Sequence, residues 1–121
     1  MIMKKTFIVV ALVLACWAHA YAGLKTEGSG NTLRLDPSGF PPDMKARYEI
    51  MQVRCIKCHT LERAIIAITT GIAPVSGQPF DKSSTKAYGI KMLRKTDSNM
   101  SKEDVKAVVE LMNFLLDEAA R

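Results

Sequence analysis

The residues of this chain whose types and spacing can do chemistry are concentrated in one short stretch. It reads Cys55-Ile56-Lys57-Cys58-His59, a C-x-x-C-H pattern. The two thiols face the same way on a helical turn, so each can add to one vinyl group at a porphyrin edge and form a thioether. The histidine that follows is then held under the iron, where its ring nitrogen can bind as the proximal ligand. The motif therefore predicts one covalently attached haem c, bound by Cys55, Cys58 and His59.

The N-terminal residues have the three-part layout of a secretory signal peptide. Met1 to Lys5 provide a positive start, Thr6 to Trp17 are almost purely apolar, and Ala20-Tyr21-Ala22 offers a small-residue cleavage pattern. The apolar run is too short to span a bilayer comfortably. We therefore predict that residues 1–22 are removed and that the protein is periplasmic. Lipid anchoring at Cys16 is the alternative, which we disfavour because the residues before this cysteine are unusual for a lipoprotein signal.

Removal of residues 1–22 restricts the chemistry that the motif can support. The chain keeps 99 residues (121 − 22) and a net charge of +3 ((17 − 2) − 12), with Cys55, Cys58 and His59 as its only cysteines and histidine. A structural zinc site needs four ligands, so these residues cannot complete one without a carboxylate. A thioredoxin-type pair requires a βαβ context, which the sequence lacks. A disulfide between these two cysteines is strained, although an oxidising envelope can form one.

Hydrophobic periodicity predicts an all-α domain over residues 41–121, and no strand is expected anywhere in the chain. Residues 23–40 are rich in Gly, Ser and Thr, and we expect a flexible leader with little fixed structure there. Residues 71–79 are expected to form a loop. The predicted helices run from Pro41-Pro42 into the motif, over residues 61–70, from a cap at Ser83 or Ser84 to about Arg94, and onward from Ser101.

The last predicted helix has the clearest signals. Ser101 is placed to cap it, and Asp104 lies three residues on, in the capping-box position. An apolar stripe at helical spacing follows, formed by Val105, Val108, Val109, Met112, Leu115 and Leu116. The first helix has a shorter stripe, formed by Met44, Tyr48, Met51 and Cys55. Two such stripes predict two helices that bury their apolar faces in one core.

These features resemble the class I cytochromes c over Pro41 to Leu116, and in particular the small monohaem electron carriers and the haem subunits of periplasmic dehydrogenases. The resemblance implies three to four helices wrapped around one covalent haem. It also implies that the first helix crosses the last one, so that Tyr48 and Met51 meet the stripe around Val108. In this family a proline carbonyl lies near the free nitrogen of the haem-binding histidine, a role that the resemblance gives to Pro74.

The second axial ligand is predicted to be a methionine. His59 is the only histidine after residue 22, so two histidines cannot bind one haem within this chain. Class I proteins use a methionine some residues before the last helix, and Met92 and Met100 are the candidates. We favour Met92, because its nine-residue distance from Ser101 leaves a loop able to approach the iron. The chain departs from the family pattern in having Leu93, not proline, after this methionine. The other methionines, Met44, Met51 and Met112, are assigned to the core.

The resemblance implies a carrier of single electrons and not an enzyme. Weak docking of redox protein partners at the exposed haem edge is expected, with basic residues around it: Arg54, Lys57, Lys86, Lys91, Arg94 and Lys95. Nucleic acid is not an expected partner of an exported chain with this charge, and no segment after residue 22 is long enough for a stable membrane span. Two alternatives stay open, a five-coordinate haem enzyme or ligand sensor, and a haem subunit of a periplasmic dehydrogenase complex. The lack of a distal histidine disfavours the enzyme.

Overall fold

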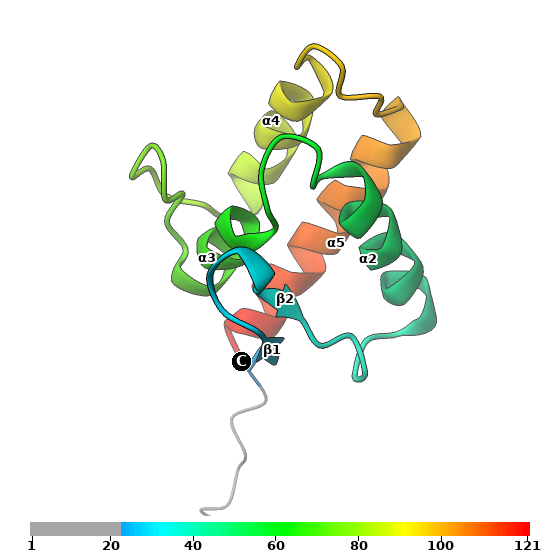
Figure 1. The fold of residues 1–121 in the computed structure, drawn as a ribbon. Helices are drawn as coiled ribbons and strands as arrows, with labels where there is room; N and C mark the ends of the chain where they lie inside the picture. Colours follow the sequence, from blue (N-terminus) through cyan, green and yellow to red (C-terminus); the bar gives the residue numbers. More distant parts are fainter. Residues whose placement is uncertain (1–22) are drawn as a thin grey trace, which may run out of the picture.

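Four α-helices account for most of the chain that the computed structural model describes, residues 23–121 (Figure 1). They are α2 (Pro42–Arg54), α3 (Glu62–Thr70), α4 (Lys82–Leu93) and α5 (Lys102–Ala119). The prediction of a mainly helical domain is therefore confirmed, with helices close to the expected bounds. The predicted signal peptide and its alternative lipid site, Cys16, lie outside the described residues.

Helix α5 is the element on which the other helices pack, and it runs through the middle of the fold in Figure 1. Its start is fixed by the predicted capping box. The Ser101 hydroxyl accepts the Asp104 N–H at 3.0 Å, and the Asp104 carboxylate accepts the Ser101 N–H at 3.0 Å. Its apolar face is fully buried at Leu111 and Leu115. A buried leucine of this kind contributes about 1.5–3 kcal/mol relative to an exposed one.

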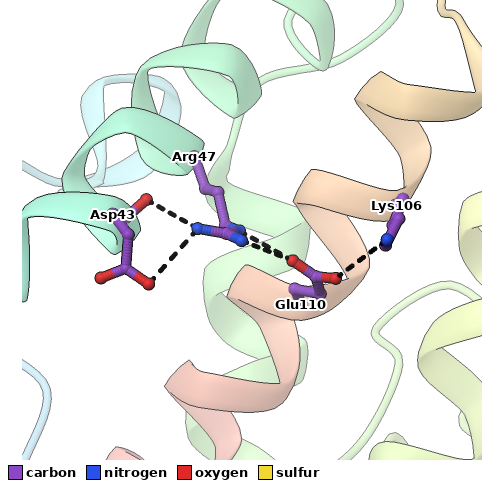
Figure 2. Close-up of polar contacts among 4 residues, drawn as sticks. All are labelled: Asp43, Arg47, Lys106 and Glu110. Atoms are coloured by element: carbon purple, nitrogen blue, oxygen red, sulfur yellow. Dashed lines mark hydrogen bonds and ion pairs between the residues drawn. The ribbon is translucent and has the colours of Figure 1, made fainter.

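Helix α2 crosses α5 and carries the cysteine motif at its C-terminal end. Tyr48 and Met51 are both 2% exposed and belong to the same core cluster as Val108, as expected. At the surface, the Arg47 guanidinium donates two hydrogen bonds to the Glu110 carboxylate on α5, at 2.7 and 2.9 Å (Figure 2). A partly exposed ion pair of this kind adds little stability, about 0.2–1 kcal/mol, so the buried contacts contribute most to the packing of the two helices.

The expectation of a flexible leader over residues 23–40 is wrong for its central part. Strands β1 (Thr26–Glu27) and β2 (Arg34–Leu35) pair antiparallel around a 3-10 turn at Gly30–Thr32. Leu35 is 1% exposed and belongs to the core. Strands of two residues are too short to produce an alternating pattern, so the prediction that the chain contains no strand is also wrong here. They are held by packing and by a hydrogen bond from another element.

That hydrogen bond comes from Tyr48 on α2. Its hydroxyl accepts the Leu35 N–H at 2.8 Å and donates to the Leu35 carbonyl at 3.2 Å. Both backbone groups of a buried residue are thereby satisfied by one side chain, which fastens the N-terminal hairpin to the helix pair. Buried backbone groups without partners are costly, so this contact determines whether the hairpin stays in place.

The cap of α4 also differs from expectation. Asp81, not Ser83 or Ser84, is the N-cap residue, and its carboxylate accepts the N–H groups of both serines at 2.9 and 3.2 Å. Hydrogen bonds from Ser83 lower the pKa of Asp81 below its ordinary value. Aspartate caps helices as well as serine does, and here it stands two residues before Ser83. None of the described helices combines the length and apolarity that a membrane crossing requires.

Replacing Tyr48 by phenylalanine tests the attachment of the hairpin. Tyr48→Phe keeps the ring but leaves the buried N–H and C=O of Leu35 without their partner, at an expected cost of about 1–3 kcal/mol. Thermal unfolding followed by circular dichroism measures this loss. Tyr88→Phe is the matched control, because the Tyr88 hydroxyl contacts only the exposed Ser76 hydroxyl among the described residues. Equal melting temperatures for the two variants would contradict the assigned role of Tyr48.

Candidate haem site

One cavity of about 530 Å³ collects the residues that the sequence singled out. Cys55, Cys58, His59, Met92 and Met100 all line it. They come from the turn after α2, the end of α4 and the segment before α5. The volume lies within the range of about 300–1,000 Å³ that is typical of small-molecule and cofactor sites. The structure therefore brings every predicted site residue, including both candidate methionines, to one place.

The cysteine turn follows directly from the way α2 ends. The Cys55 N–H continues the helical pattern by donating to the Met51 carbonyl at 2.9 Å, and Arg54 is the last helical residue. The chain then leaves the helix, so that Cys55 is half-buried and Cys58 is exposed. Because Met51 is fixed in the core, the start of this turn has a defined position relative to α5.

His59 lies just beyond the turn and is half-buried. Its Nδ1 is 2.8 Å from the carbonyl oxygen of Thr60. A proton on Nδ1 that is donated to this oxygen leaves Nε2 with a free lone pair, which is the form that binds a metal. The resemblance gave this role to the carbonyl of Pro74. Pro74 does line the cavity, but the carbonyl that bonds to His59 is that of Thr60, the next residue in the chain.

Most of the cavity wall is apolar and several of its residues are small. Sequence reasoning missed a group of these wall residues: Leu61, Ala64, Ala67, Ala73, Phe80 and Gly89. Gly89 has a specific reason to be glycine. A Cβ at this position would lie 2.8 Å from Val109 Cγ2 and 3.0 Å from Val105 Cγ1, both on α5. A glycine inside a helical pattern was a usable signal for this close approach of α4 and α5.

The two candidate methionines differ in backbone setting. Met92 lies in the last turn of α4, and Met100 lies in the loop immediately before the cap of α5. Both side chains are half-buried. Core assignments for the other methionines are confirmed, because Met51 and Met112 are buried and Met44 packs against the core. Met51 and Met112 also line the cavity from its inner side.

The thiols and charges around the cavity differ in environment. Burial raises the pKa of Cys55 to about 11, with a further contribution from the negative charge of Asp104.

Of the predicted basic residues, Arg54, Lys57, Lys91 and Lys95 line the cavity, and Arg63 joins them. Lys86 and Arg94 are exposed and lie outside this lining.

The side chains that line the cavity are compatible with a thioether-attached haem. Across residues 23–121, no three His, Cys, Asp or Glu side chains gather as a group that could hold a metal ion. What the cavity offers is two thiols, one imidazole and thioether sulfurs on an apolar wall. Such a site suits a large apolar cofactor that is fixed at its edge and ligated through its metal.

Alkylation of the haem-free chain tests the difference between the two thiols. The thiolate is the reactive form, so in native buffer at about pH 8 iodoacetamide should label exposed Cys58 well before Cys55. As the pH approaches 11, Cys55 should ionise and react. The unfolded chain loses this proton near the ordinary pKa of 9.0, whereas the folded chain keeps it until the pH approaches a pKa of about 11. The free energy of unfolding should therefore fall as the pH rises from the first pKa to the second. Peptide mass mapping measures both sites.

The control for this experiment is the same labelling in urea, where the two cysteines should react at similar rates. Equal rates in native buffer as well would show that Cys55 is not buried as described.

No family model, curated protein or solved structure matches this chain. The cavity and the residues around it are therefore the observations on which a function can be proposed.

Proposed function

We propose that this chain is a monohaem c-type cytochrome that carries single electrons between redox proteins of the bacterial cell envelope. One haem c is attached through Cys55 and Cys58, with His59 as its proximal ligand. The observation that carries the proposal is the convergence of both thiols, the imidazole and two methionines on one largely apolar cavity. The helical fold is compatible with the class I cytochromes c that the sequence resembles.

The residues of the chain have separate tasks in this proposal. Cys55 and Cys58 hold the cofactor at its edge, so that it cannot dissociate. Thr60 orients the His59 ring and leaves Nε2 available as a ligand. The apolar wall, including Ala67, excludes water from the cofactor. When bound, the haem supplies one-electron redox chemistry whose potential depends on its axial ligands and its surroundings.

A methionine as second axial ligand would make the chain a carrier and not an enzyme. With His59 on one side and Met92 on the other, no coordination position is left for a substrate. A thioether ligand also stabilises ferrous iron and raises the reduction potential. Met92 stays the proposed ligand, with Met100 as its competitor from the same cavity.

Partners are proposed to dock weakly at the cavity mouth through charge. Lys57, Arg63, Lys91 and Lys95 line the cavity and are exposed, so this face attracts acidic surfaces. Electrostatic attraction of this kind speeds encounter without holding the partner for long. A carrier that must release its partner after each electron needs fast association together with fast dissociation.

A lasting place in a dehydrogenase complex is the second candidate, and exposed aliphatic side chains favour it. Val75 is 77% exposed and lines the cavity, and Ile56, between the two cysteines, is 54% exposed. Apolar contacts survive high salt, whereas docking by exposed charges is screened. Copurification of a partner from envelope extracts at high salt would therefore favour the complex subunit, and its loss would favour the free carrier.

Alanine variants of the two methionines test the axial ligation. In the haem-loaded protein, Met92→Ala should abolish the far-red band of methionine-bound ferric iron and allow the reduced protein to bind carbon monoxide at once. The reason is that an open coordination position binds small ligands. Met100→Ala is the matched control and should keep the wild-type spectrum. The reverse pattern would identify Met100 as the ligand, and immediate carbon monoxide binding by the unmodified protein would contradict the carrier.

A further inference from the structure

Arg54 makes contacts that neither the fold nor the cysteine motif requires. It is the last residue of α2 and directly precedes Cys55. One of its terminal nitrogens donates a hydrogen bond to the carbonyl oxygen of Asn99 at 3.3 Å. Its Nε is 3.4 Å from Oδ2 of Asp104. A single side chain beside the first cysteine thus reaches the segment that precedes α5.

The segment that Arg54 reaches has unusual backbone geometry. Asp97 and Asn99 have positive φ angles of 61° and 52°, which side chains other than glycine adopt rarely. Aspartate and asparagine enter this region more readily than other non-glycine residues, so these two residues favour the turn. The Ser98 hydroxyl ties the turn to α4 by donating to the carbonyl of Leu93, the last residue of that helix, at 3.1 Å. The bond from Arg54 to Asn99 ties the turn to α2.

Both candidate methionines flank the segment. Met92 lies one residue before Leu93, and Met100 follows Asn99. Asp104 adds a second connection, because the oxygen that pairs with Arg54 also accepts the Ser101 N–H in the cap of α5. Arg54 therefore connects the cysteine side of the cavity to its methionine side, whichever methionine is the ligand.

We propose that Arg54 is a positioning residue that holds the methionine-bearing side of the cavity against the cysteine turn. Its guanidinium donates a hydrogen bond to the Asn99 carbonyl and forms an ion pair with the Asp104 carboxylate at the same time. The Arg54 side chain is 40% exposed and that of Asp104 is 18% exposed, so the pair adds little to global stability. Its effect is local, on how firmly the methionine stays at the iron. This inference rests on the proposed function.

Imidazole binding to the ferric haem-loaded protein tests the proposal. Imidazole must displace the axial methionine, so a looser methionine side raises its apparent affinity. Arg54→Gln should raise the association constant about tenfold, while the far-UV spectrum and melting temperature stay near those of the wild type. Arg54→Lys keeps the charge but cannot make the Asn99 hydrogen bond and the Asp104 ion pair with one planar group, so it should recover only part of the effect.

Lys45→Gln is the matched control, since it removes the same charge from an exposed side chain of α2 that does not line the cavity. It should leave imidazole affinity within about twofold of the wild type. Asp104→Asn keeps an oxygen for the Ser101 N–H and removes the ion pair, so it should act in the same direction as Arg54→Gln. Because both residues belong to one contact, the effect of the double variant should be smaller than the sum of the two single effects. Equal imidazole affinities for Arg54→Gln and Lys45→Gln would overturn the proposal.

Hydrogen exchange separates this inference from the proposed function. Exchange at the amides of residues 97–101, measured by mass spectrometry, should be faster in Arg54→Gln than in the wild type, with or without cofactor. A wild-type protein that carries no haem would refute the proposed function. The exchange rates alone would then show whether Arg54 holds residues 97–101 in place. Unchanged exchange in Arg54→Gln would show that Arg54 does not hold the segment.

Discussion

The packing of α2 against α5 is the constraint on which the other features of the site depend. Tyr48 and Met51 bury their side chains in the core that α5 supplies, and Arg47 is joined to Glu110 at the surface. With α2 held in this way, its last residue and the cysteine turn have a fixed place beside the start of α5. The same contact positions Tyr48 so that its hydroxyl fastens the N-terminal hairpin. The packing of these two helices thus positions both the cavity and the N-terminal hairpin.

The cavity is a consequence of how closely the remaining helices approach α5. Gly89 lets α4 pack directly on the valines of α5, which brings Met92 to the cavity wall. Helix α3 supplies Ala67, and the segment between α3 and α4 supplies Ala73 and Phe80, so the inner wall is apolar. A site made from elements so far apart in the chain cannot exist without the folded core. Its chemistry is nevertheless concentrated in the turn after α2, where both thiols and the imidazole lie.

The sequence was sufficient to predict the elements whose signals are local. The first and last helices had apolar stripes, and the Ser101 cap had its partner three residues on, so these features were found. Leu111 was left out of the predicted stripe, yet it is fully buried because three helices surround α5 and widen its buried face. The hairpin was missed because its strands are too short for a pattern and depend on Tyr48. The Arg54 contact joins residues 45 positions apart, and no periodicity encodes such a contact.

The central claim is covalent attachment of one haem through Cys55 and Cys58, and the intact mass of the exported protein tests it most directly. The chain should be produced in a host that attaches c-type haem and analysed by mass spectrometry under denaturing conditions. The account predicts a mass increased by one haem, lost entirely in Cys55→Ala/Cys58→Ala. A wild-type protein with the mass of the polypeptide alone would contradict it.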